Sequence, residues 1–259
     1  MSDSMRGRRP SCSRFSSERV YHTMPAITTR ELLNLYPKAL QTAPQWIIMK
    51  QKNRGRRDRN MNHDELTRIF RDPPVIETPR LTLRKMLKRD SGDMYEYARD
   101  PAVSEFLLWQ PHESETYTRR YLTYLQSRYR AGDFHDWAVV WREADKMIGT
   151  CGFTAFRIES NSAEIGYVLN RAYWGMGIAP EAVRAILRFG FLELHLHRIE
   201  AHYMIGNERS RRVMEKVGMR YEGTLRDSLF VKGSYVSVGV CSILENEYRG
   251  MYGIPSPSL

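Results

Sequence analysis

The sequence has few cysteines and no long hydrophobic run, and these two absences exclude several classes of protein. Its 259 residues contain only Cys12, Cys151 and Cys241, an odd number at wide separations and without the spacing of metal ligands. We therefore expect reduced thiols in a cytoplasmic protein, with Cys151 and Cys241 in the core because both lie in strand-like stretches. No uninterrupted apolar run approaches the length of about twenty residues that spanning a membrane requires.

Two common phosphate-binding patterns are also missing, although a glycine pair stands where such a loop could form. Gly175 and Gly177 lie between a strand-like stretch, 163–169, and a long amphipathic segment. A Walker loop ends in Gly-Lys-Ser/Thr, which the residues after Gly177 do not provide. A dinucleotide fingerprint needs a third glycine and opens the first βαβ unit of a sheet. The pair is either a plain tight turn or a helix N-terminus with free N–H groups, which favours phosphate.

Positive charge is concentrated in the first part of the chain. Residues 1–72 contain 15 Lys and Arg against 7 Asp and Glu, and the remainder is almost balanced. Residues 1–24 are rich in Arg and Ser and have little to bury, so we predict a basic, disordered extension over 1–72. A solvated tail, an arm that binds nucleic acid or the ribosome, and a transit peptide are all compatible with this composition. Translation from Met61 is a further possibility.

Hydrophobic alternation and turn residues predict one αβ domain over residues 73–250, followed by a tail over 251–259. Helices are expected over 91–100, 113–131, 180–194 and 208–217. Strands are expected over 81–83, 137–141, 147–156, 163–169, 198–205, 223–231 and 235–244. Gly218 fits a left-handed cap at the end of its helix, because a residue without Cβ adopts that conformation most easily.

Several short motifs stand in a fixed order between residues 76 and 249. They are Ile76–Arg84, Ile148-Gly149, Ala163–Tyr167, Tyr173–Ala182, His197–Ala201 and the block from Asn207 to Gly223. Together they resemble the GNAT superfamily of N-acetyltransferases, and within it the ribosomal-protein N-terminal acetyltransferases (RimJ/RimL type). The resemblance implies a GNAT fold of the α/β (α+β) class. Its mixed, mostly antiparallel sheet has splayed fourth and fifth strands and is flanked by helices.

The same resemblance implies a binding site for acetyl-CoA, the acyl donor. The residues expected at its pyrophosphate, mainly through backbone N–H groups, are Trp174, Gly175, Met176, Gly177, Ile178 and Ala179. The family usually has Arg or Gln where this chain has Trp174, which leaves the backbone as the main contributor there. Asn207 either only caps the next helix or also hydrogen-bonds the pantetheine amide. Ser210 would protonate the departing thiolate.

The amine acceptor must lose a proton before it can attack. An α-amine is neutral roughly a tenth of the time at pH 7, whereas a lysine is neutral less than about a thousandth of the time. Glu164, in the fourth strand near the splay, is the first candidate for the general base, and Glu222 and Asp227 are weaker candidates. A paired surface carboxylate is the structural alternative for Glu164.

We therefore expect an acetyl-CoA-dependent N-acetyltransferase that acts on a primary amine, with a protein N-terminal α-amine, such as that of a ribosomal protein, as the leading substrate. A polyamine, an amino sugar or an amino-bearing drug is an alternative acceptor. A non-catalytic RNA- or ribosome-binding protein with a GNAT-like body is the alternative from another class. We expect a monomer or homodimer with no membrane contact. No metal site is expected, because His195, His197 and His202 are assigned to a helix end and strand faces.

Overall fold

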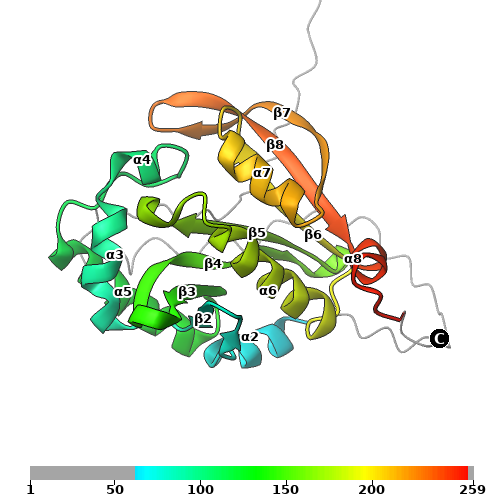
Figure 1. Ribbon diagram of the computed structural model, residues 1–259, viewed down its shortest axis with the longest axis horizontal. Coiled ribbons are helices and arrows are strands. Elements are labelled where there is room, and N and C mark those ends of the chain that lie inside the picture. Colours follow the sequence, from blue (N-terminus) through cyan, green and yellow to red (C-terminus); the bar gives the residue numbers. More distant parts are fainter. Residues whose placement is uncertain (1–61, 256–259) are drawn as a thin grey trace, which may run out of the picture.

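One mixed sheet organises residues 62–255, which are the residues that the computed structural model describes (Figure 1). Its strands are β1 (Ile76–Glu77), β2 (Leu81–Arg84), β3 (Asp136–Trp141), β4 (Lys146–Arg157), β5 (Ser162–Leu169), β6 (Arg198–Met204), β7 (Arg220–Val231) and β8 (Ser234–Leu244). They lie in the order β1-β2-β3-β4-β5-β6-β8-β7. All neighbours are antiparallel except β5 and β6, which are parallel. The predicted mixed, mostly antiparallel sheet is confirmed.

The predicted splay lies between β5 and β6. These strands pair only from Ser162 to Ile165 of β5, opposite Arg198 to Ala201 of β6. Beyond that point β5 continues to Leu169 without a strand partner on this side. They are the fourth and fifth strands of the resemblance, because the first predicted strand is divided into β1 and β2. The open edge of β5 leaves backbone groups available to a bound molecule.

The helices begin and end largely where the sequence predicts. They are α2 (His63–Arg71), α3 (Ser91–Ala98), α4 (Pro101–Ser104), α5 (Glu115–Ala131), α6 (Ile178–Leu192), α7 (Glu208–Lys216) and α8 (Glu245–Tyr252). Ser114 accepts a hydrogen bond from Tyr117 N and caps α5, and Gly218 has the left-handed φ of 88° that was expected after α7. Helix α8 falls where the sequence analysis assigned no helix. In the described part of the chain, no helix is both long and apolar enough to cross a membrane.

Helices cover both faces of the sheet, and the alternation along β3 shows the division. Trp137 and Val139 belong to the larger core, which includes side chains of α2 and α6. Ala138 and Val140 belong to a second core with side chains of α3 and α5. We call this second side of the sheet the α5 face. Cys151 and Cys241 are buried, as predicted.

Helix α2 lies within the segment that was predicted as an extension, but it packs with the domain. Leu66 and Phe70 are buried in the larger core, and the Phe70 ring lies 5.4 Å from that of Trp137, centroid to centroid. Asn62 caps the helix by accepting a hydrogen bond from Glu65 N. The folded part therefore starts before residue 73. The predictions for residues 1–61, including the basic arm and translation from Met61, lie outside the described residues.

Candidate active site

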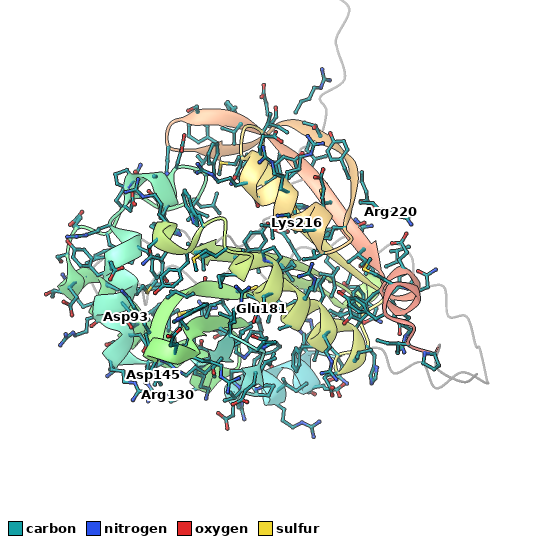
Figure 2. All side chains as sticks on the ribbon, viewed as in Figure 1. Asp93, Arg130, Asp145, Glu181, Lys216 and Arg220 are labelled. Atoms are coloured by element: carbon teal, nitrogen blue, oxygen red, sulfur yellow. The ribbon has the colours of Figure 1, made fainter. Side chains whose placement is uncertain are left out.

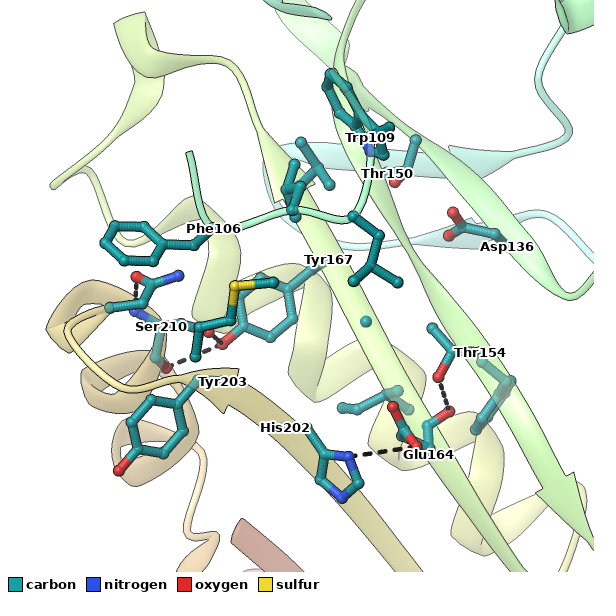
Figure 3. A pocket seen from close by; sticks show the side chains of 18 of the residues that line it. Phe106, Trp109, Asp136, Thr150, Thr154, Glu164, Tyr167, His202, Tyr203 and Ser210 are labelled. Atoms are coloured by element: carbon teal, nitrogen blue, oxygen red, sulfur yellow. Dashed lines mark hydrogen bonds and ion pairs between the residues drawn. The ribbon is translucent and has the colours of Figure 1, made fainter. Parts of the chain in front are cut away.

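A cavity of about 290 Å³ opens at the separation of β5 and β6 (Figure 3). Its walls come from β5 and β6, from the start of α7, and from the loop between α4 and α5. A further part lies on the α5 face of β3 and β4. The charged and hydroxyl side chains at its walls are those of Tyr97, Tyr121, His135, Asp136, Thr150, Thr154, Glu164, Tyr167, His202, Tyr203 and Ser210.

The glycine loop leads directly into helix α6. Gly175 and Gly177 have φ angles of 80° and 76°, and Gly177 is the N-cap of the helix. The first N–H groups of a helix have no partner inside it, so those of Ile178 and Ala179 can meet an anion. Nothing lies within 4 Å of where a Cβ of Gly175 would be. The loop therefore has the backbone conformation and the open space that a pyrophosphate would need.

Arg80 joins this loop to the beginning of the sheet. Its Nη1 donates to the carbonyl oxygen of Met176 at 2.9 Å, and its Nε donates to Glu181 Oε2 at 2.7 Å. Glu181 lies in the first turn of α6, where it is labelled in Figure 2. Burial by itself raises the pKa of Glu181, but hydrogen bonds from Thr78 and Arg80 outweigh it and hold the pKa below its usual range. The start of α6 is thus fixed by an ionised carboxylate.

Trp174 stands where the family usually has Arg or Gln, and its contacts in this chain are structural. Its Nε1 donates to the carbonyl oxygen of Leu169 at 2.8 Å, which ties the loop to the end of β5. The guanidinium of Arg209 lies 4.6 Å above the Trp174 ring. Arg209 therefore brings a positive charge from α7 beside the position where the family usually has Arg or Gln.

Asn207 and Ser210 both line the cavity at the start of α7. Asn207 is the predicted cap, since its Oδ1 accepts from Ser210 N at 3.1 Å. Ser210 Oγ lies 2.8 Å from the phenol oxygen of Tyr167, which also donates to the Ser210 carbonyl oxygen at 2.9 Å. The sequence analysis placed Ser210 at this site but not Tyr167, because two residues on different elements give no spacing signal.

Glu164 is buried at the cavity wall, and its partners come from β4 and β6. Its Oε2 lies 3.5 Å from His202 Nδ1 and 3.9 Å from Arg157 Nη2. His202 Nε2 in turn lies 3.2 Å from Glu200 Oε1. Burial by itself raises the pKa of Glu200, but the hydrogen bond from His202 and the charge of Arg157 together lower it to about 2. The predicted base therefore lies in a network of charged side chains.

The potential ligand atoms of Glu164, Glu200 and His202 all lie within 4.8 Å of one another, a separation that could hold a metal ion. Sequence spacing did not reveal this group, since its members meet across β5 and β6. However, Arg157 Nη2 lies 2.8 Å from Glu200 Oε1, and Arg198 Nη2 lies 3.2 Å from Glu200 Oε2. These guanidinium groups already compensate the carboxylates, which favours an ion-pair network over a metal site.

The other predicted carboxylates and histidines lie away from the cavity walls. Glu222 is paired with Arg198 at 2.5 Å, and Arg198 lowers the Glu222 pKa below its usual range. Asp227 accepts from Ser237 Oγ on the exposed β7–β8 hairpin. Two of the three histidines, His195 and His197, lie between α6 and β6, close to the predicted helix end.

Asp136 is a carboxylate that the sequence analysis did not consider, and it also lines the cavity. Asp136 is the first residue of β3, and its Oδ1 accepts from Trp137 N at 2.9 Å. Burial raises the pKa of Asp136 to about 7, although a hydrogen bond from Thr150 opposes the rise. The nearby hydroxyl of Tyr97 is buried and finds no hydrogen-bond partner among the described residues. The sequence offered one signal for this residue, because Asp136 is an acidic residue directly before an apolar strand.

Comparisons with known proteins agree with this geometry. A family model described as an acetyltransferase (GNAT) domain matches residues 80–220. The uncharacterized N-acetyltransferase p20 of Bacillus licheniformis is 36% identical over 176 residues, which cover 68% of this chain and 99% of the relative. The ribosomal protein uS5-alanine N-acetyltransferase of Escherichia coli is 25% identical over 167 residues, which cover 62% of this chain and 85% of that enzyme.

A solved structure extends the likeness to three dimensions. The crystal structure of an acetyltransferase (GNAT family) from Bacillus anthracis superposes with a TM-score of 0.60 at 29% identity. The match covers 67% of this chain and 99% of that chain.

Proposed function

The chain belongs to the GNAT acetyltransferase family and transfers acetyl groups, and from this premise we propose that its acceptor is a protein N-terminal α-amine. The observation that carries the proposal is the cavity at the separation of β5 and β6, which is lined by Asn207 and Ser210 and by the carboxylates of Asp136 and Glu164. The Escherichia coli relative is named for an alanine of a ribosomal protein, and this name supports a polypeptide acceptor. We therefore infer the class of acceptor from the RimJ/RimL-type relatives of this chain.

Acetyl-CoA is the donor in this proposal. The conformations of Gly175 and Gly177 fit a pyrophosphate at the start of α6, and the unpaired edge of β5 fits a pantetheine arm that pairs with it as a strand would. Asn207 would bind a pantetheine amide. An N–H of β5 on the open side would stabilise the thioester oxygen as it becomes negative.

The reaction we propose is direct attack of the amine on the thioester. The nitrogen lone pair forms the C–N bond, the C–S bond breaks, and Ser210 gives a proton to the sulfur. This acid needs to supply little, because a thiol with a pKa of about 8.5 is a fair leaving group. A carboxylate of the α5 face would take the proton of the ammonium. Glu164 is the candidate from the sequence, and Asp136 lies on the same face.

A panel of acceptors tests the proposed class directly. Acetyl-CoA and the full chain are incubated with peptides that have a free α-amine, with spermidine and with an amino sugar, and release of the CoA thiol is followed. We expect turnover with peptides at least about tenfold above that with either small amine. Faster turnover of spermidine or the amino sugar would assign the enzyme to small-molecule acceptors. Binding of RNA without turnover of any amine would support the non-catalytic alternative.

A further inference from the structure

The α5 face of the sheet contains a row of positions that lack side chains. Asp136 of β3 pairs with Gly152 of β4, and Gly152 pairs with Gly166 of β5. Paired positions on neighbouring strands point to the same face, and strands lie about 4.8 Å apart, so this row spans about 10 Å. A Cβ at Gly152 would lie 2.7 Å from Asp136 Oδ1, and a Cβ at Gly166 would lie 2.8 Å from Thr154 Cγ2, so neighbouring side chains occupy the space above both glycines. The missing side chain of Gly152 therefore makes room for the Asp136 carboxylate, which lies over Gly152 on the side of β3 that faces β5.

Asp136 has the surroundings of a binding group for a cation. Tyr97 of α3, Tyr121 and Tyr129 of α5 and the buried thiol of Cys151 on β4 all lie within electrostatic range of its carboxylate. Burial raises the pKa of each of these four groups, so none of them is charged near neutral pH. Burial and hydrogen bonds from Thr150 and Trp137 account for the pKa of Asp136, and no Arg or Lys among the described residues contributes to it. Aromatic rings beside an uncompensated carboxylate are typical of ammonium recognition.

The unpartnered hydroxyl of Tyr97 is the second observation that points to a ligand. A buried polar group without a partner costs free energy, so such groups are rare unless something binds them. Tyr97 lines the cavity together with Asp136, and its side chain is almost wholly buried. A primary amine offers several N–H groups, which can donate to the Asp136 carboxylate and to the Tyr97 oxygen at once. One bound amine would thus give a cation to the Asp136 carboxylate and a hydrogen-bond partner to the Tyr97 hydroxyl.

Glu164 lies on the same face but has different surroundings. Its Oε2 already faces His202 and Arg157, at 3.5 Å and 3.9 Å. Figure 3 shows it beside His202, whereas Asp136 lies beside Thr150 in another part of the cavity. An incoming ammonium would have to compete with Arg157 for Glu164, but would meet no such cation at Asp136.

We propose that the acceptor's ammonium docks on Asp136 and Tyr97 at the cavity wall, and that Asp136 rather than Glu164 takes its proton. This inference rests on the proposed function. One proton of the ammonium passes to the Asp136 carboxylate, and the neutral nitrogen attacks the thioester carbon. As the C–N bond forms and the C–S bond breaks, a second proton leaves the nitrogen and one reaches the sulfur through Ser210. Acetylated amine, free thiol and a protonated Asp136 result, and Asp136 then releases its proton to solvent.

The match in acidity favours an α-amine over a lysine. The pKa of Asp136 is about 7, and that of an ordinary α-amine is about 7.7–8.0, so proton transfer between them is almost balanced. Transfer from a lysine, with a pKa of about 10.4, would be strongly uphill. The acidity of Asp136 thus supports an α-amine, rather than a lysine, as the acceptor.

The test compares the pH profiles of three variants of the full chain. The substrate is a lysine-free peptide with an N-terminal alanine. D136N should lower kcat/KM at least about thirtyfold at pH 7 and less than about fivefold at pH 9.5, where the amine arrives neutral. Its profile should retain only the ionisation of the amine and lose the one near pH 7. E164Q should lower kcat/KM less than about tenfold, and its pH profile should keep both the ionisation of the amine and the one near pH 7. D133N, which removes the charge of an exposed neighbour, should match the parent chain.

A second variant keeps the inference testable if D136N affects folding. Y97F removes only the unpartnered hydroxyl, so its thermal midpoint should be unchanged or higher, while KM for the peptide rises about fivefold or more. The inference is overturned if E164Q loses about a hundredfold and D136N stays within threefold of the parent chain. In that case Glu164 is the base and the proposed function stands. Failure of the parent chain to acetylate the peptide would instead contradict the proposed function.

Discussion

The phenol of Tyr167 on β5 and the hydroxyl of Ser210 on α7 form a pair across the opening between β5 and β6. Their oxygen atoms lie 2.8 Å apart, and the phenol also donates to the Ser210 carbonyl oxygen. Burial raises the pKa of Tyr167 well above its usual value, so the phenol keeps its proton over the working range of pH. The pair therefore orients the Ser210 hydroxyl in the cavity.

Removal of this pair should have a modest kinetic effect. We expect S210A to lower kcat about two- to tenfold, because the thiol is already a fair leaving group. Y167F should cause a similar or smaller loss, and the double variant should be no worse than S210A, since both act through one hydroxyl. Steady-state kinetics gives these values, with unchanged calorimetric affinity for acetyl-CoA as the control. A loss of about a thousandfold in S210A would give this hydroxyl a larger role.

The glycine loop predicts a specific loss of donor binding. G177V should weaken acetyl-CoA binding by about 2–4 kcal/mol, the value of one or two charge-assisted hydrogen bonds, because the side chain crowds the approach to the helix N-terminus. A valine is also strained at the φ of 76°. G253V is the matched control, since Gly253 has a φ of 62° after α8 and lies outside the loop. Equal calorimetric affinities in folded G177V and G253V would remove the pyrophosphate from this loop.

Glu181 should stabilise the fold in a pH-dependent way. Its pKa in the folded chain lies below its usual value, so the stability that it contributes is present at neutral pH. It is lost as the pH falls below about 4.5, through the folded pKa. E181Q should lower the free energy of unfolding by about 1 kcal/mol at pH 7 and by less at pH 3. The expected change is small because Arg80, the partner of Glu181, is partly exposed to solvent. Urea unfolding at the two pH values measures this, with the exposed E193Q as control. A difference independent of pH would contradict the account.

Asp136 should have the opposite effect on stability. Its pKa in the folded chain is raised to about 7, so the native state holds a proton that the unfolded chain loses near pH 4. The ionised carboxylate therefore destabilises the fold increasingly as the pH rises from about 4 to 7. D136N, whose amide oxygen can still accept from Trp137 N, should be more stable than the parent chain by at least about 1 kcal/mol at pH 8. A less stable D136N at pH 8 would show that the carboxylate is satisfied within the fold.

The local features of the sequence predicted most of the fold. The strands expected over 137–141 and 147–156 are found as the antiparallel pair β3 and β4, and Asn207 and Gly218 marked the two ends of α7. These signals are local, because a cap or a turn depends on residues a few positions apart. Helix α2 was missed because only Leu66 and Phe70 are fully buried, within a short segment that has four charged residues.

The site was less predictable because its groups meet across strands. Glu164, Glu200 and His202 lie together only through the parallel pairing of β5 and β6, which no sequence spacing encodes. Asp136 lies one residue before the strand expected over 137–141. Its proposed role depends on Gly152 opposite it on β4 and on tyrosines of α3 and α5, which are distant in the sequence. The resemblance suggested the loop, Ser210 and Glu164, whereas only the structure revealed the partners of Glu164 and the place of Asp136 at the cavity.

The central claim is that the enzyme acetylates an N-terminal α-amine, and one peptide can test it. The full chain is incubated at pH 7 with acetyl-CoA and a peptide that has both a free N-terminus and one internal lysine. Fragmentation mass spectrometry then locates the acetyl group. The account predicts modification of the α-amine, with the lysine acetylated at least about a hundredfold more slowly. Acetylation of the lysine first, or of neither amine although acetyl-CoA binds, would contradict it.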